Sequence, residues 1–121
     1  MIPLFIVVRE DMKEPIIYLD ILKQELSTKQ LTEVLTEFFQ CLQNCVEDII
    51  EGFLNNDFVQ IKSNLKTVQI IATSMYSPYV AEFALLCESY AEPGKESCLK
   101  ETFVILFKQI TLLKRECNDY F

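Results

Sequence analysis

The chain reads FLNNDFVQI at residues 53–61, and the polar break within this stretch, Asn55-Asn56-Asp57, decides the fold. Apolar residues recur every three or four positions from Leu31 up to this break, which is the spacing of one face of an amphipathic helix. The same spacing resumes at Phe58 and continues to Met75. Because Asn and Asp are favoured at the N-termini of helices, the break predicts two long helices that run antiparallel.

Further signals divide the rest of the chain into helices. Ser27, followed three residues later by Gln30, forms a capping box, so a helix should begin there. A short first helix should precede it, starting near Pro15. Ser77-Pro78 separates the return helix from the next one, and Glu92-Pro93-Gly94-Lys95 is a turn before the last helix.

These helices predict an all-α fold with a single domain, residues 1–121. We expect an antiparallel up-and-down bundle of four core helices with a short additional helix at the N-terminal side. Gly52 and Gly94 should both end helices. The side chains expected to pack the two central helices together are Phe38, Leu42, Cys45, Ile49, Phe58, Ile61, Leu65 and Val68.

Composition restricts the function. With 18 acidic and 11 basic residues, the formal net charge of -7 repels nucleic acid, so no nucleic-acid partner is expected. The apolar start Met1–Val8 is too short to span a bilayer and lacks a basic leader, so we expect a packed segment and no membrane span. Five cysteines, an odd number lying largely within apolar helical pattern, favour a reducing, cytoplasmic compartment.

The chain contains no histidine, which removes the commonest general base, phosphoryl carrier and zinc ligand. Cys41 and Cys45 share a helical face, but without histidine or a second cysteine pair they should pack in the core rather than bind a metal. The carboxylates of Glu47, Asp48 and Glu51 fit a solvated helix face. We therefore expect no catalytic residues, no metal, no cofactor and no enzyme activity.

The pattern resembles the histidine-containing phosphotransfer (HPt) domains over about residues 31–113. The resemblance rests on Phe38, on the acidic turn Asn56-Asp57, on a return helix that would carry the site, and on the segment Phe83–Cys87. The family's His-x-x-Lys-Gly motif is missing from this chain. The resemblance therefore implies a pseudo-HPt module that docks a receiver domain or a similar signalling partner without carrying phosphate.

The position of the missing histidine has three alternatives. Counting from Asp57 gives Lys66, counting back from Cys87 gives Gln69, and matching the motif's Leu-Lys pair gives Ser63. Neither serine without a base nor an ordinarily protonated lysine replaces histidine chemically. One stripe of the return helix contains Lys62, Lys66, Gln69 and Thr73, and Ser63 borders this stripe. The predicted partner-binding residues are Lys62, Ser63, Lys66, Gln69 and Thr73.

A second resemblance leads to a different class of partner. Glu101–Ile110, one amphipathic helix, is similar to part of the small poxviral Bcl-2-like proteins, which are acidic cytoplasmic helical bundles. That resemblance implies a viral helical bundle that binds host apoptosis or innate-immune signalling proteins, with one apolar helix surrounded by the others. Under both resemblances the partner is a protein, and the sequence is also compatible with a homodimer.

Overall fold

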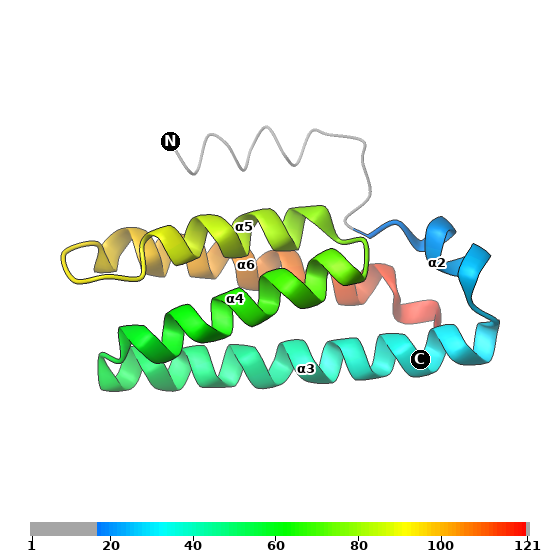
Figure 1. Cartoon of the computed structure of the whole chain (residues 1–121), viewed down its shortest axis with the longest axis horizontal. Coiled ribbons are helices and arrows are strands. Elements are labelled where there is room, and N and C mark those ends of the chain that lie inside the picture. The colour runs from blue at the N-terminus through cyan, green and yellow to red at the C-terminus, as the bar shows by residue number, and fades with distance from the viewer. Residues whose placement is uncertain (1–16, 121) are drawn as a thin grey trace.

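The computed structural model describes residues 17–120, and all regular structure in this range is helical (Figure 1). This agrees with the predicted all-α class. The elements are α2 (Leu19–Glu25), α3 (Thr28–Asn55), α4 (Phe58–Ser74), α5 (Pro78–Ser89), α6 (Glu96–Glu116) and the 3-10 turn η1 (Asn118–Tyr120). The chain reverses direction from α3 to α4, α5 and α6, and each of these helices packs against the next.

The start of α3 confirms the predicted capping box. The Gln30 backbone N–H donates to Ser27 Oγ at 3.2 Å, and the Ser27 N–H donates to Gln30 Oε1 at 2.9 Å. These two bonds satisfy donors that the first turn of a helix leaves without partners. The sequence signal therefore places this helix start correctly.

The end of α3 differs from the prediction, because Gly52 lies inside the helix and does not end it. The helix continues to Asn55, and its C-cap is Asn56, whose φ of 52° is in the left-handed region that Asn tolerates. The next residue, Asp57, donates its N–H to the Gly52 carbonyl at 2.8 Å. Gly52 is buried, and a Cβ added to it would meet Ile61 Cγ1 at 2.7 Å. Its small size therefore lets α4 approach α3 closely.

The short helix α2 begins at Leu19. Ile17 and Tyr18 therefore lie before the helix, although the sequence predicted a helix that starts near Pro15. Pro15 and the apolar segment Met1–Val8 lie outside the described residues. The Tyr18 N–H donates to the Tyr76 carbonyl at 3.0 Å, and Tyr76 Oη lies 3.4 Å from a Glu25 carboxylate oxygen. These contacts join α2 to the corner between α4 and α5.

The later turns follow from local residue chemistry. Asp57 caps α4, because its side-chain Oδ1 accepts a hydrogen bond from the Gln60 backbone N–H at 3.0 Å. Pro78 occupies the first turn of α5, where a backbone N–H has no partner within the helix and its loss costs no hydrogen bond. Tyr76, two residues before this proline, has a φ of 55°, an uncommon conformation for a bulky residue. Gly94, with φ of 90°, lies in the predicted turn before α6. It does not end a helix as predicted, because α5 already stops at Ser89 with Tyr90 as its C-cap.

The core is one cluster of apolar side chains drawn from every α-helix of the described range. Of the eight predicted contact residues, seven are buried, and Phe58 is partly exposed while packing against the cluster. Phe83 of α5 is the largest fully buried side chain. The amphipathic pattern of α3 and α4 therefore identified the buried faces of both helices.

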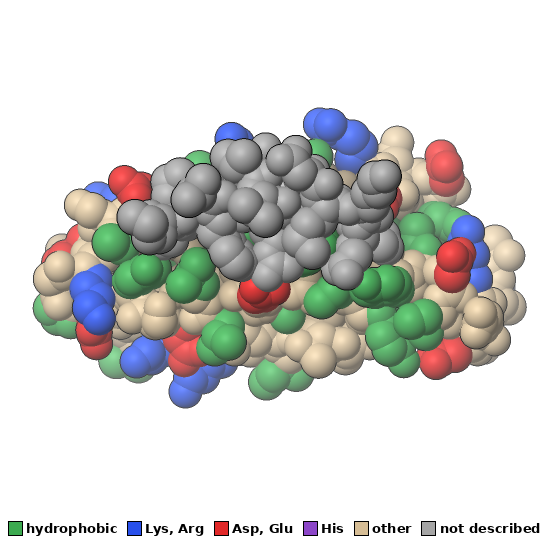
Figure 2. Space-filling view, turned by 90° about the horizontal axis from the view of Figure 1, so that it is seen from above, with side chains coloured by type: hydrophobic (Ala, Val, Ile, Leu, Met, Phe, Trp, Pro, Cys, Tyr) green, Lys and Arg blue, Asp and Glu red, His purple; other side chains and the backbone are tan. Residues whose placement is uncertain are grey.

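The surface carries a mixture of side chains. Seen from above, the described part of the molecule shows hydrophobic side chains interspersed with charges of both signs (Figure 2). Between residues 17 and 120, no helix is long and apolar enough to cross a bilayer.

Candidate functional site

All five predicted partner-binding residues lie on α4. The buried residues of this helix are Ile61, Leu65, Val68 and Ala72. The predicted stripe is the same series moved by one position, and one residue turns an α-helix by about 100°. It therefore lies on the flank of α4 beside the core. Within the stripe, Lys62, Lys66 and Thr73 are exposed and Gln69 is partly buried, and the bordering Ser63 is also exposed.

Glu88 of α5 contacts two residues of this flank. The Gln69 side-chain amide donates to one Glu88 carboxylate oxygen at 2.7 Å, and Lys66 Nζ lies 3.7 Å from the other oxygen. The Glu88 side chain is 15% exposed, whereas the Lys66 side chain is 62% exposed. Gln69 and Lys66 thus help to join α4 to α5, and Glu88 offsets the charge of Lys66 locally. Nothing in the spacing along the chain pointed to Glu88 as their partner.

The turn after α5 continues this mixed-charge edge. Lys95 lies 2.7 Å from Glu92, and this hydrogen bond and charge pair holds the pKa of the exposed Glu92 carboxyl below its ordinary value. Lys62 lowers the same pKa further through its charge, although its effect is smaller than that of Lys95. Lys62 of α4 and the α5–α6 turn therefore share one electrostatic environment.

The outward side of α4 carries two exposed apolar residues that the sequence interpretation did not include. Val59 is 80% exposed and Ile70 is 71% exposed. A hollow of about 430 Å³ beside Ile70 is lined by Gln69, Ile70, Thr73 and Ser74. We define the α4 face as the exposed surface formed by Val59, Lys62, Ser63, Lys66, Ile70 and Thr73. A signal was present in the sequence, because Val59, Ser63, Lys66, Ile70 and Thr73 recur at helical spacing.

Charge distinguishes α4 from the other helices. Among the helices that the structure describes, α4 is the one without an acidic residue, although the whole chain has a formal net charge of -7. Its two charged residues are Lys62 and Lys66. The α4 face therefore combines two cations with exposed apolar side chains, which suits contact with an acidic protein surface.

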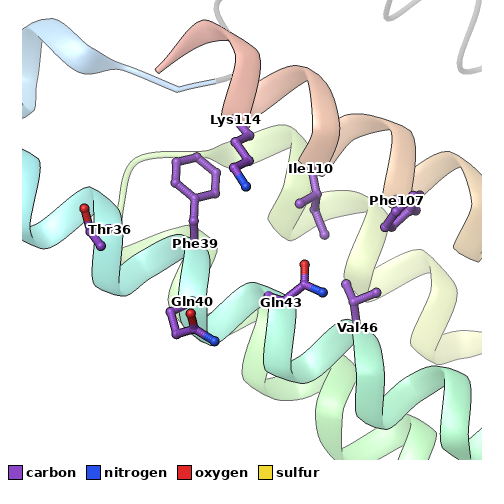
Figure 3. Close-up of a pocket in the computed structure, with 8 residues that line it drawn as sticks. All are labelled: Thr36, Phe39, Gln40, Gln43, Val46, Phe107, Ile110 and Lys114. Carbon is purple, nitrogen blue, oxygen red and sulfur yellow. The ribbon is translucent and has the colours of Figure 1, made fainter. Parts of the chain in front are cut away.

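A groove lies between α3 and α6 (Figure 3). It has a volume of about 440 Å³ and is lined by Thr36, Phe39, Gln40, Gln43, Val46, Phe107, Ile110 and Lys114. Phe39, Val46 and Ile110 are buried and form its apolar floor, while Phe107 is 47% exposed. At one end, α3 and α6 meet through the rings of Phe53 and Phe103, whose centroids are 5.4 Å apart.

The cysteines occupy different environments. Cys45, Cys87 and Cys117 are buried, and Cys98 is exposed. Of the pair expected to pack in the core, Cys45 is therefore buried, whereas Cys41 is only partly buried. Burial raises the pKa of the Cys87 thiol to about 12 and that of Cys117 to about 11. Because the thiolate is the nucleophile and metal ligand, these two side chains behave as small apolar residues. Within residues 17–120, no group of three or more Cys, Asp and Glu residues could hold a metal ion.

No family model, curated protein or solved structure matches the chain. The geometry and charge of the described residues therefore carry the functional argument.

Proposed function

We propose that the protein is a non-catalytic, cytoplasmic protein-interaction module that docks an acidic partner through the α4 face. In this proposal residues 1–121 form one domain, and α3, α4, α5 and α6 form a four-helix up-and-down bundle like that of the HPt domains. The single observation that carries the proposal is the exposed face of α4, a helix without acidic residues, in a chain of net charge -7. The partner would be a receiver domain or a signalling protein with a comparable acidic surface.

Lys62 is the stronger electrostatic determinant of this face. Lys66 already lies 3.7 Å from Glu88, so part of its charge is offset within the molecule. Surface charges of this kind mainly change the association rate and its dependence on salt, and they contribute little to folding stability. Val59 and Ile70 add apolar area at either side of the lysines. Burial of that area on binding stabilises the complex without depending on salt.

Charge reversal tests the proposed docking surface. The variant Lys62→Glu with Lys66→Glu should weaken binding to a purified receiver domain on the order of tenfold at low ionic strength. Because Lys66 is exposed, the melting temperature should change by only a few degrees at most. A second double variant, Lys29→Glu with Lys108→Glu, makes the same change in net charge on exposed positions of α3 and α6. It should bind nearly as well as the parent.

Titration calorimetry at low and at physiological salt would measure the three affinities. Equal affinity of the parent and the α4 variant would reject the α4 face as the docking surface. Equal weakening of both double variants would show that net charge, rather than this face, controls binding.

The absence of phosphoryl transfer is tested separately. The chain has no histidine, so a phosphorylated receiver domain should leave no stable radiolabel on it. A genuine HPt protein in the same assay serves as the positive control. Labelling of this chain at the control's rate would show that another side chain accepts the phosphoryl group, and the non-catalytic part of the proposal would be wrong.

A viral Bcl-2-like module that binds host apoptosis or innate-immune signalling proteins is the second candidate. The observation that favours it is the exposure of apolar residues on α6, within the segment that resembles those proteins: Val104 is 56% exposed and Phe107 is 47% exposed. Partner capture from native lysate separates the two candidates. A partner that is lost with Phe107→Asp but retained by the α4 charge-reversal variant would favour this second candidate.

A further inference from the structure

The face between α3 and α6 exposes several apolar side chains around the groove. We define the α3–α6 face as the groove-lining residues together with Ile50 and Val104. Ile50 is 45% exposed and lies four residues after Val46, one of the residues that line the groove. Val104 is 56% exposed and lies three residues before Phe107, which also lines it. Helical spacing therefore places both beside the groove and extends the apolar surface along the same face.

This face contains both a projecting side chain and a recess. Phe107 is a large aromatic residue with almost half of its surface exposed, and the groove beside it has a buried floor of Phe39, Val46 and Ile110. An interface between two identical molecules requires a patch that is complementary to itself. A patch that carries an aromatic projection next to an apolar recess meets that requirement, since each copy can supply both parts.

Charge determines how two copies would be oriented. α3 carries five acidic residues and one lysine, whereas α6 carries four basic and three acidic residues. On α3, the helical stripe of the groove-lining Thr36, Gln40 and Gln43 also includes two acidic residues and, at the start of the helix, one lysine: Glu33, Glu47 and Lys29. On α6, Lys114 lines the groove. A pairing of α3 on α3 would bring like charges together, whereas a pairing of α3 on α6 brings acidic residues to basic ones.

We propose that two copies of the chain pair through the α3–α6 face, with α6 of each copy packed on α3 of the other. The two-fold axis of this isologous dimer runs parallel to the helices. Phe107 of each copy enters the groove of its partner, and Lys114 comes to lie near Glu33 at the rim. The α4 face takes no part in the pairing, so this inference is independent of the proposed docking function.

Sedimentation of the full chain over a concentration series from about 1 μM to about 100 μM tests the pairing. The parent should shift from monomer to dimer within this range. Phe107→Asp should raise the dimer dissociation constant by at least about 30-fold, since buried aromatic residues dominate interfaces of this kind. Leu85→Asp is the matched control, because it makes the same charge change at an exposed apolar residue of α5, outside both the α4 face and the α3–α6 face. It should dimerise like the parent.

A charge swap tests the orientation without touching the apolar residues. Lys114→Glu should weaken the dimer, and adding Glu33→Lys should restore part of the lost affinity, because the two changes exchange the signs of one pair. Both residues are exposed, so the fold should tolerate the changes, and circular dichroism would verify this. Restoration supports the α3-on-α6 orientation, and further weakening by Glu33→Lys overturns it.

The proposal is overturned if the parent stays monomeric across the whole series. It is also overturned if folded Phe107→Asp dimerises as well as the parent. A monomeric parent that binds an amphipathic helical peptide, and loses that binding with Phe107→Asp, would instead assign the groove to a helix from another protein.

Discussion

At the residue scale, Gly52 shows how a single side chain sets the distance between two helices. A Cβ at this position would lie 2.7 Å from Ile61 Cγ1 and 3.2 Å from the Asp57 carbonyl oxygen. Alanine normally stabilises a helix interior by about 1 kcal/mol relative to glycine. Here the overlap involves a buried side chain near its root and a backbone atom, so the strain should outweigh that gain.

We therefore expect Gly52→Ala to lower the free energy of unfolding by roughly 1–3 kcal/mol in urea titrations. In an Ile61→Ala background the closer of the two clashing atoms, Ile61 Cγ1, is absent, so the added cost of Gly52→Ala should be smaller, with only the 3.2 Å contact to the Asp57 carbonyl oxygen remaining. A parent-background Gly52→Ala variant that is as stable as the parent, or more stable, would contradict the close approach of α3 and α4.

The buried thiols give a second prediction at this scale. Burial raises the pKa of Cys87 from its ordinary 9.0 to about 12, so folding favours the neutral thiol. This contribution to stability is complete below the unfolded pKa and is lost as pH rises toward the folded value. The free energy of unfolding should consequently fall between about pH 9 and about pH 12.

Cys87→Ala isolates this effect, because the variant lacks the titrating group. Urea titrations at pH 7 and pH 10 should show a smaller loss of stability for the variant than for the parent between the two pH values. An equal loss in both proteins would mean that other groups control the alkaline destabilisation. Thiol titration gives an independent check, since exposed Cys98 should react much faster than buried Cys87 in the folded protein.

At the element scale, sequence patterns succeeded where a local hydrogen bond decides the outcome. Ser27 and Gln30 complete their capping box within one turn, and Asp57 caps α4 in the same local way. Gly52 was wrongly predicted to end a helix. The small residue is needed there for a tertiary contact, the close approach of Ile61 from the next helix, and this contact is not visible in the local sequence. A residue type alone does not reveal which neighbour will pack against it.

The candidate site shows the same division between local and tertiary information. Helical spacing placed the predicted residues together along one helix, because that relation depends only on the period of an α-helix. The period alone did not show that Gln69 and Lys66 would be engaged by Glu88 of α5. The helical period also gave no information on the distance between α3 and α6. The separation of these two helices creates the groove beside Phe39 and Phe107.

The two sides of α4 provide a matched test of its packing. Leu65 is fully buried and Ile70 is 71% exposed on the same helix. Leu65→Ala should lower the free energy of unfolding by about 2–5 kcal/mol, because it removes core contacts and leaves a cavity. Ile70→Ala should change it by less than about 0.5 kcal/mol. Chemical denaturation of both variants would measure the difference, and similar costs at the two positions would contradict the orientation of α4.

At the scale of the whole molecule, stability and self-association are connected. Residues from α2 through α6 contribute to one apolar cluster, so the chain should unfold in a single cooperative transition. Far-ultraviolet circular dichroism and tyrosine fluorescence should follow the same curve in urea. Two separated transitions would show that the helices belong to independently folding parts.

The proposed dimer adds a concentration dependence to that transition. Partner binding to the folded state stabilises it by mass action, so the melting temperature of the parent should rise with protein concentration. Phe107→Asp removes the residue that enters the partner's groove, and its melting temperature should be nearly independent of concentration. Differential scanning calorimetry at low and high concentration would compare the parent with this variant and with Leu85→Asp, which should behave like the parent. If all three proteins melt at the same temperature at every concentration, folding stability is a property of the single chain and the α3–α6 face contributes nothing to it.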